Sequence, residues 1–164
     1  MARKSGGKHF KLECLDKDEG WNQWTDEMKS LEAEDVEVGI FAGDRGDKGT
    51  YIADYALDNE IGTDKIPSRP WMRSTVDDNR AKYNRAIDRQ VDGIADGLRT
   101  LAILTKIGEL LTNDFQEAIT RWKDPPNAPY TIKKKGKDDP LQDTGAMRKS
   151  IRYRLIRVVK YGKE

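Results

Sequence analysis

The residue types that carry most enzyme chemistry are scarce in this chain. His9 is the only histidine and Cys14 is the only cysteine, so a Ser-His or Cys-His catalytic pair would have to use His9. One imidazole and one thiolate cannot supply the ligands of a typical zinc site. The chain contains neither a Walker-type nor a dinucleotide-type glycine loop. We therefore expect a protein that is not an enzyme and that uses no metal and no cofactor.

Carboxylates, in contrast, are abundant, and two of them beside a lysine could serve a magnesium-dependent nuclease. They gather in four places: Asp16, Asp18 and Glu19; Asp54, Asp58 and Glu60; Asp77 and Asp78; Asp138 and Asp139. Each group lies on a charged face or in a loop, and a chain with 29 acidic residues contains such groups by chance. A metal-dependent nuclease stays open as an alternative.

The strongest basic run covers residues 133–135 and continues at Lys137. Clustered lysines release counterions when they bind nucleic acid, so contact with DNA is one interpretation. Asp138 and Asp139 follow directly, which favours a solvated loop of balanced charge. Across the chain 30 basic residues face 29 acidic ones, and this balance lacks the basic excess of a general nucleic-acid binder. A DNA-contacting protein is the other alternative.

The length and composition indicate one domain, which either is elongated or carries long solvated helices. A chain of 164 residues can bury a core without disulfides or metals. Its charged fraction is 36%, whereas a typical domain has about a quarter, so much of the surface is exposed. No segment approaches the roughly 18 apolar residues of a membrane span, and the basic start lacks the apolar stretch of a signal peptide. We expect synthesis in the cytosol and no membrane partner.

Residue patterning predicts a flexible basic arm at residues 1–8, a single domain at 9–160 and a tail at 161–164. Alternation predicts strands at residues 9–15, 36–40 and 151–159, with Cys14 as a small buried hydrophobe. Helical spacing predicts helices at 18–31, 50–61, 70–98, 100–122 and 145–150. The expected packing residues are Trp21, Trp24, Met28 and Leu31; Tyr51, Ile52, Tyr55, Ala56 and Ile61; Met72, Val76, Tyr83, Ile87, Val91, Ile94 and Leu98; and Leu101, Leu104, Ile107, Leu111, Phe115, Ile119 and Trp122.

The two long helices each carry one apolar stripe and a charged back, so they should form a hairpin that lies on a sheet. The predicted fold class is α+β: a small, mainly antiparallel sheet packed against a long αα-hairpin, with one or two short helices. Asp18, Thr100 and Thr144 are the expected N-caps, and Gly62 is expected to end the helix before it.

The stretch from Pro125 to Tyr153 is polar, yet it contains four prolines and two glycines that restrict the backbone. A flexible linker needs no such residues. A loop that is ordered before contact loses less entropy when a partner binds. We therefore predict a long ordered docking loop at residues 124–143, which favours assembly over catalysis.

Two blocks of this sequence carry a family resemblance. The first comprises Ala128-Pro129, Thr131-Ile132, Lys135-Gly136, Pro140-Leu141, Asp143-Thr144-Gly145, Met147-Arg148, Ser150-Ile151 and Tyr153. The second comprises residues 59–63 (NEIGT) and 66–73 (IPSRPWMR), and a weaker match covers residues 107–119. In this order and spacing the blocks resemble the signature of tailed-bacteriophage virion-morphogenesis proteins, the tail-completion and head–tail joining family.

The resemblance implies a structural subunit of the virion that completes the tail or joins tail to head at the neck. Its partners would be further copies of the chain in a closed ring, a hexamer by tail symmetry, together with tail-tube, terminator and neck or connector proteins. Packaged DNA could pass nearby. The expected contact residues are Arg69, Trp71, Arg73, Lys133, Lys134, Lys135 and Arg148. The residues expected to shape the two loops are Pro67, Pro70, Pro129, Gly136, Pro140, Asp143, Thr144 and Gly145.

Overall fold

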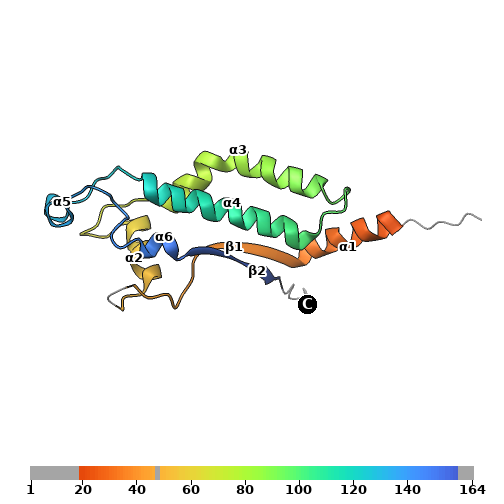
Figure 1. Cartoon of the computed structure of the whole chain (residues 1–164), viewed down its shortest axis with the longest axis horizontal. Helices are drawn as coiled ribbons and strands as arrows, with labels where there is room; N and C mark the ends of the chain where they lie inside the picture. Colours follow the sequence, from red (N-terminus) through yellow and green to blue (C-terminus); the bar gives the residue numbers. More distant parts are fainter. Residues whose placement is uncertain (1–18, 47–48, 159–164) are drawn as a thin grey trace, which may run out of the picture.

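The structure, a computed structural model, describes residues 19–46 and 49–158. Its body consists of two long helices and two strands (Figure 1): α3 (Trp71–Asp92), α4 (Thr100–Arg121), β1 (Glu34–Ile40) and β2 (Ile151–Arg157). The helix α4 packs against both strands, and α3 packs against α4. The predicted α+β class, the antiparallel sheet and the αα-hairpin are therefore confirmed.

Several predictions fall on residues that the structure does not describe. These are the arm at 1–8, the strand at 9–15 with Cys14, His9, the cap at Asp18, Val159 and the tail at 161–164, all of which lie outside the described residues.

The sheet has an apolar face toward α4 and a charged face away from it. The strands pair antiparallel over seven positions, from Glu34 opposite Arg157 to Ile40 opposite Ile151. On the charged face Arg154 donates to Glu37 at 2.7 Å. On the other face the ring of Tyr153 lies against α4. The alternation in both strands thus decides which side the helices cover.

The core lies where α4 meets the end of the sheet. The rings of Trp71 and Phe115 pack edge to face, with centroids 5.9 Å apart. Ile119 and Ile151 are almost completely buried beside them. Burial of such large side chains contributes about 1.5–3 kcal/mol each, so this cluster fixes the orientation of α4 on the sheet.

The first described helix, α1 (Glu19–Ala33), leads directly into β1. Trp21 and Trp24 stack on it with centroids 5.3 Å apart. The expectation that both tryptophans are core residues is wrong for Trp21, whose exposed fraction is 60%. The reason is the position of α1, which extends beyond the end of the α3–α4 hairpin (Figure 1).

Other helix predictions need smaller corrections. The helix α2 (Ile52–Ile61) buries Ile52 and Ala56 and ends at Gly62, as expected, but Tyr51 and Ile61 are exposed. The exposed helix residues Val76, Ile87 and Leu101 also lie outside the core. Arg99, rather than Thr100, is the N-cap residue of α4, and Thr100 is its first residue.

The stretch expected to be a loop at 124–143 contains a helix, α5 (Pro129–Lys135). No residue of α5 is buried, which explains why no periodic apolar pattern revealed it. After α5 the chain runs through a loop at 136–145 into the short helix α6 (Ala146–Lys149) and then β2. Gly145, rather than Thr144, occupies the N-cap position of α6, with φ 79°.

Candidate functional site

Residues of both blocks of the family resemblance line one end of the molecule, and Arg69 of the block at 59–73 holds the chain where it enters the other block. Its main-chain N–H donates to Asn59 O at 2.6 Å and its Nη1 to Asn59 Oδ1 at 3.0 Å. Its Nε and Nη2 donate to the carbonyl oxygens of Pro125 and Pro126 at 3.0 and 2.8 Å. Arg69 therefore ties the α2–α3 junction to the start of the loop that carries α5.

Arg69 is 5% exposed, which is unusual for an arginine. Burial lowers its pKa, and the Asp138 carboxylate acts in the opposite direction. Arginine stays protonated over the whole physiological range, so the guanidinium keeps its donors. In place of a surface contact, the structure assigns this side chain to holding two segments of one chain together.

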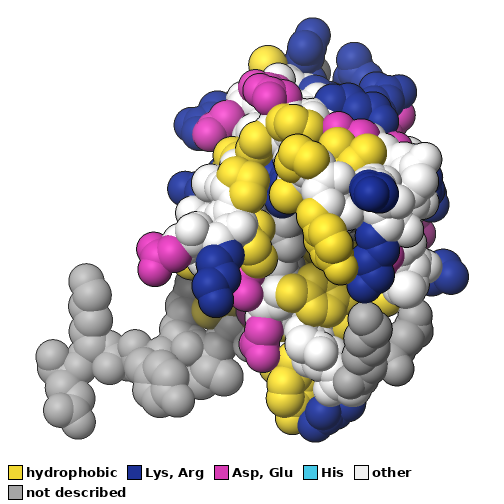
Figure 2. Space-filling view, turned by 90° about the vertical axis from the view of Figure 1, so that its left-hand side faces the viewer, with side chains coloured by type: hydrophobic (Ala, Val, Ile, Leu, Met, Phe, Trp, Pro, Cys, Tyr) yellow, Lys and Arg dark blue, Asp and Glu magenta, His cyan; other side chains and the backbone are white. Residues whose placement is uncertain are grey.

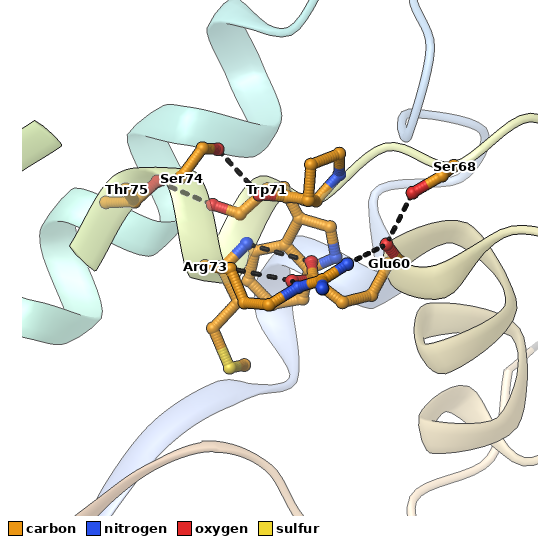
Figure 3. A network of polar contacts seen from close by, with 8 residues as sticks. Glu60, Ser68, Trp71, Arg73, Ser74 and Thr75 are labelled. Carbon is orange, nitrogen blue, oxygen red and sulfur yellow. Dashed lines mark hydrogen bonds and ion pairs between the residues drawn. The ribbon is translucent and has the colours of Figure 1, made fainter. Parts of the chain in front are cut away.

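The start of α3 is capped by a side chain from α2 (Figure 3). The carboxylate of Glu60 accepts from the main-chain N–H of Met72 at 2.9 Å and of Arg73 at 3.1 Å. Arg73 Nε also donates to this carboxylate at 3.1 Å. Ser68 Oγ donates to the main-chain oxygen of Glu60 at 3.0 Å. Unpaired N–H groups at a helix start favour a negative charge, so Glu60 fixes the angle between α2 and α3.

Trp71 and Arg73, both expected partner contacts, take different positions. Trp71 is 2% exposed and belongs to the core, so it packs inside this chain. The side chain of Arg73 is 63% exposed, although it pairs with Glu60. Of these two residues, only Arg73 is presented on the surface.

The loop at 136–145 is held at several points. Lys135 Nζ donates to the carbonyl oxygen of Asp139 at 2.9 Å and also to that of Gln142. Gln142 Nε2 donates to Thr120 O at 3.0 Å. Pro140 is almost fully buried. The loop is therefore anchored on the last turns of α4, and Lys135 stabilises it from within.

Asp138 and Asp139, which the sequence left open as metal ligands, bind to the protein itself. Asp138 Oδ1 accepts from the main-chain N–H of Asn127 at 2.9 Å. Asp139 pairs with Lys123 at 3.2 Å and with Lys137 at 2.9 Å. These two ammonium groups lower the pKa of the Asp139 carboxyl, Lys137 being the stronger influence.

The glycines and prolines of the loop have identifiable roles. Gly136 ends α5 with φ 73°, and its N–H donates to Ile132 O at 2.8 Å. Pro129 is the first residue of α5, where its missing N–H costs nothing. Thr144 Oγ1 accepts from Ala146 N–H at 3.3 Å. Pro67 and Asp143 are exposed, and Pro70 is the N-cap residue of α3.

Exposed basic and aromatic side chains gather on α5 and near it. Lys133, Lys134 and Arg148 are exposed, and none of them forms an ion pair within the described part of the chain. Tyr130 on α5 is 76% exposed. Arginine and tyrosine are enriched at protein-binding surfaces, whereas lysine is depleted there and contributes charge instead.

A cleft of about 700 Å³ lies beneath α5. Its walls come from α5, from the loop at 136–145 and from α2 with the turn before it, and they include Tyr55, Asn59, Asn127, Tyr130, Lys134 and Thr144. Figure 2 shows this end of the molecule, where hydrophobic side chains form a band with Lys and Arg side chains on both sides. We call α5, the loop at 136–145 and this cleft the docking end.

The sequence did not reveal the partners that hold the docking end. Asn59, Glu60, Pro125 and Pro126 act through main-chain or side-chain groups that only the fold brings together. The available signal was that Asn59 and Glu60 belong to one block of the resemblance together with Arg69.

Two further findings concern metals and membranes. Within residues 19–46 and 49–158 no group of three or more His, Cys, Asp or Glu side chains could hold a metal ion. In the same part of the chain no helix combines the length and apolarity that crossing a membrane requires.

Comparison with protein-family models, with curated proteins and with solved structures found no match for this chain.

Proposed function

We propose that this chain is a structural assembly subunit of a tailed bacteriophage, which completes the tail or joins it to the head at the neck and acts as a ring. One observation carries the proposal: Arg69, in the block at residues 59–73, donates hydrogen bonds to the carbonyl oxygens of Pro125 and Pro126, just before the block that begins at Ala128. A buried side chain of one block thus fixes the chain where it enters the other block, so the two form a single structural unit.

The docking end supplies the contact surface. Its backbone is fixed by Lys135, Gln142 and Pro140 before any partner arrives, so little conformational entropy is lost on binding. Lys133 and Lys134 project from α5 without an intramolecular partner in the described chain and offer charge to an acidic neighbour. The docking end thus presents a surface to a neighbouring protein of the virion, in addition to the two different faces that each subunit needs to close a ring.

Native mass spectrometry of the full chain with its tail-tube and neck proteins tests this proposal. We expect either an oligomer of the chain or a complex with one of these proteins. The variant Lys133→Glu/Lys134→Glu should lose that complex. The matched control Arg89→Glu/Lys106→Glu reverses the same number of exposed charges on α3 and α4 and should keep it. A strict monomer that binds neither tube nor neck proteins contradicts the proposal.

The exposure of Lys133 and Lys134 also favours a second candidate, contact with packaged DNA. A gel-shift assay with duplex DNA and magnesium tests it. A shift that disappears in Lys133→Glu/Lys134→Glu, without cutting of the DNA, would assign these lysines to nucleic acid. Cutting of the DNA would point instead to the nuclease alternative.

A further inference from the structure

An apolar groove of about 290 Å³ runs between β1, α3 and α4, away from the docking end. Val36 and Val38 of β1 form its floor, and Val76, Tyr83 and Ile87 of α3 form one wall. Val76 and Ile87 are 37% and 40% exposed. Tyr83 is 8% exposed. This surface has the composition of a core, and within residues 19–46 and 49–158 it remains partly exposed.

The width of the sheet explains the groove. Neighbouring strands lie about 4.8 Å apart, so two strands are about as wide as one helix of roughly 10 Å. The single helix α4 already covers β1 and β2, and α3 lies beside it on the β1 side. Within the described part of the chain, β1 pairs only with β2. A third strand on the free edge of β1 would lie under α3 and fill the groove.

One segment of this chain has the pattern that such a strand requires. In residues 9–15 the apolar Phe10, Leu12 and Cys14 alternate with Lys11 and Glu13. A strand presents alternate side chains to one face, so three apolar groups would point toward α3 and α4 while the two charges face water. Addition of a strand to an open edge is a known mode of recognition, with main-chain bonds for affinity and pockets for alternate side chains.

The length of the chain decides which copy supplies the strand. Figure 1 shows α1 and β1 following one another along the long axis of the molecule. From Glu19 to Val36 the chain passes through α1 and the start of β1, a distance of about 30 Å. The seven residues from Leu12 to Glu19 reach at most about 25 Å. The nine residues from Phe10 to Glu19 reach about 32 Å, so a copy can bring its own Phe10, but neither its Leu12 nor its Cys14, beside its own Val36. All three apolar residues can therefore fill the groove only when a second copy supplies the strand.

We propose that residues 9–15 of one copy pair with the free edge of β1 in a second copy, with Phe10, Leu12 and Cys14 seated in the groove between β1, α3 and α4. This exchange of residues 9–15 between copies rests on the assembly role proposed above, because the exchange specifies how two copies of the chain join. It gives each subunit a donor segment and an acceptor groove, which are the two different faces that a ring requires.

The single native cysteine makes a direct test possible. Val76→Cys and Ile87→Cys each introduce one further thiol, at opposite ends of the groove wall, and Arg89→Cys is a matched control on the same helix outside the groove. The full chain is treated with a short bismaleimide and separated on a denaturing gel. Whichever direction the added strand takes, we expect a cross-link between chains from Cys14 to residue 76 or 87, and none to residue 89.

Controls separate this cross-link from others. The wild-type chain reports Cys14–Cys14 pairs, and Cys14→Ser in each variant reports pairs between the new thiols. Leu12→Asp should abolish the cross-link, whereas Lys11→Asp, on the opposite face of the strand, should keep it. Circular dichroism checks that each variant is folded.

The outcomes distinguish the two proposals. A cross-link within one chain, no cross-link at either groove position, or equal loss in Leu12→Asp and Lys11→Asp would overturn the exchange of residues 9–15, and the virion role would be untouched. A cross-link between copies, in a protein that binds no tail or neck component, would support the exchange and contradict the virion role.

Discussion

The Arg69 guanidinium donates to the carbonyl oxygen of Pro125 at 3.0 Å, although 56 residues separate the two in the chain. This hydrogen bond and the one to Pro126 join the end of α2 to the segment that follows α4. The two carbonyl groups are paired with a side chain, so this guanidinium helps to fix the chain that enters α5.

Replacement of Arg69 by lysine tests this dependence. One ammonium group cannot reproduce the fork that reaches both prolines and Asn59, so we expect Arg69→Lys to lower the free energy of unfolding by about 1–3 kcal/mol. Urea denaturation measures the loss, and hydrogen exchange should rise at residues 127–136. The control Arg89→Lys, on an exposed face of α3, should change neither. An unaltered midpoint in Arg69→Lys would show that the buried guanidinium does not anchor the loop.

The helix cap at Glu60 gives a second prediction. In Glu60→Gln the charge is lost, and with it the favourable interaction with the N–H groups of Met72 and Arg73. We expect a loss of about 1 kcal/mol, measured by thermal or urea unfolding. Asp78→Asn, an exposed change in the interior of α3, is the matched control. Equal stability of the two variants would contradict the capping role.

The close packing of α4 on the sheet gives a third prediction. A Cβ atom at Gly108 would lie 2.6 Å from Cγ of the Tyr153 ring. Alanine favours a helix interior over glycine by about 1 kcal/mol, but overpacking costs about 1–3 kcal/mol, so Gly108→Ala should destabilise the protein. In the background Tyr153→Ala the same change should stabilise it, because the clash is gone. If Gly108→Ala is stabilising in both backgrounds, α4 and β2 are not in this contact.

A fourth prediction concerns acid. The Glu27 carboxylate on α1 accepts the main-chain N–H of Thr100, the first residue of α4, at 2.7 Å. This hydrogen bond lowers the pKa of Glu27 more than burial raises it. The folded pKa is below the unfolded one, so the contribution to stability is complete above about pH 4.3 and disappears as the pH falls through the folded value.

Glu27→Gln should therefore lower the free energy of unfolding at pH 7 by roughly 1 kcal/mol. Between pH 5 and pH 3 the free energy of unfolding of this variant should fall less than that of the wild type. Urea unfolding at several pH values measures both effects. Glu109→Gln, on an exposed part of α4, serves as the control. Parallel pH profiles for the wild type and Glu27→Gln would refute the link between α1 and α4.

The elements that sequence patterns predicted well are those whose residues follow a regular period. The apolar stripe through Leu104, Phe115 and Ile119 predicted α4. The alternation of apolar and polar residues at 36–40 and 151–157 predicted the two strands. Gly62 correctly indicated the end of α2, and the prolines after α4 correctly indicated the end of α4, because these residues act on the local backbone. Such regular spacing and such effects on the local backbone can be recognised in a single sequence.

The candidate site was less predictable, because its contacts are distant in the chain. Arg69 was expected on the surface, where arginine normally lies. Inside the protein its guanidinium donates to carbonyls 56 and 57 residues away and to Asn59 Oδ1. The helix α5 has no buried residue, so tertiary contacts such as those of Lys135 hold it rather than an apolar stripe. The exposure of Trp21 follows from the projection of α1, which no local pattern encodes.

The central claim is that this chain builds a virion by contact, and particles made without it test that claim most directly. Electron micrographs of a phage that lacks this chain should show full heads and tails that are not attached to one another. A phage that carries Lys133→Glu/Lys134→Glu should show the same defect, and one that carries Arg89→Glu/Lys106→Glu should be normal. Intact, infectious virions in the complete absence of the chain would contradict the account.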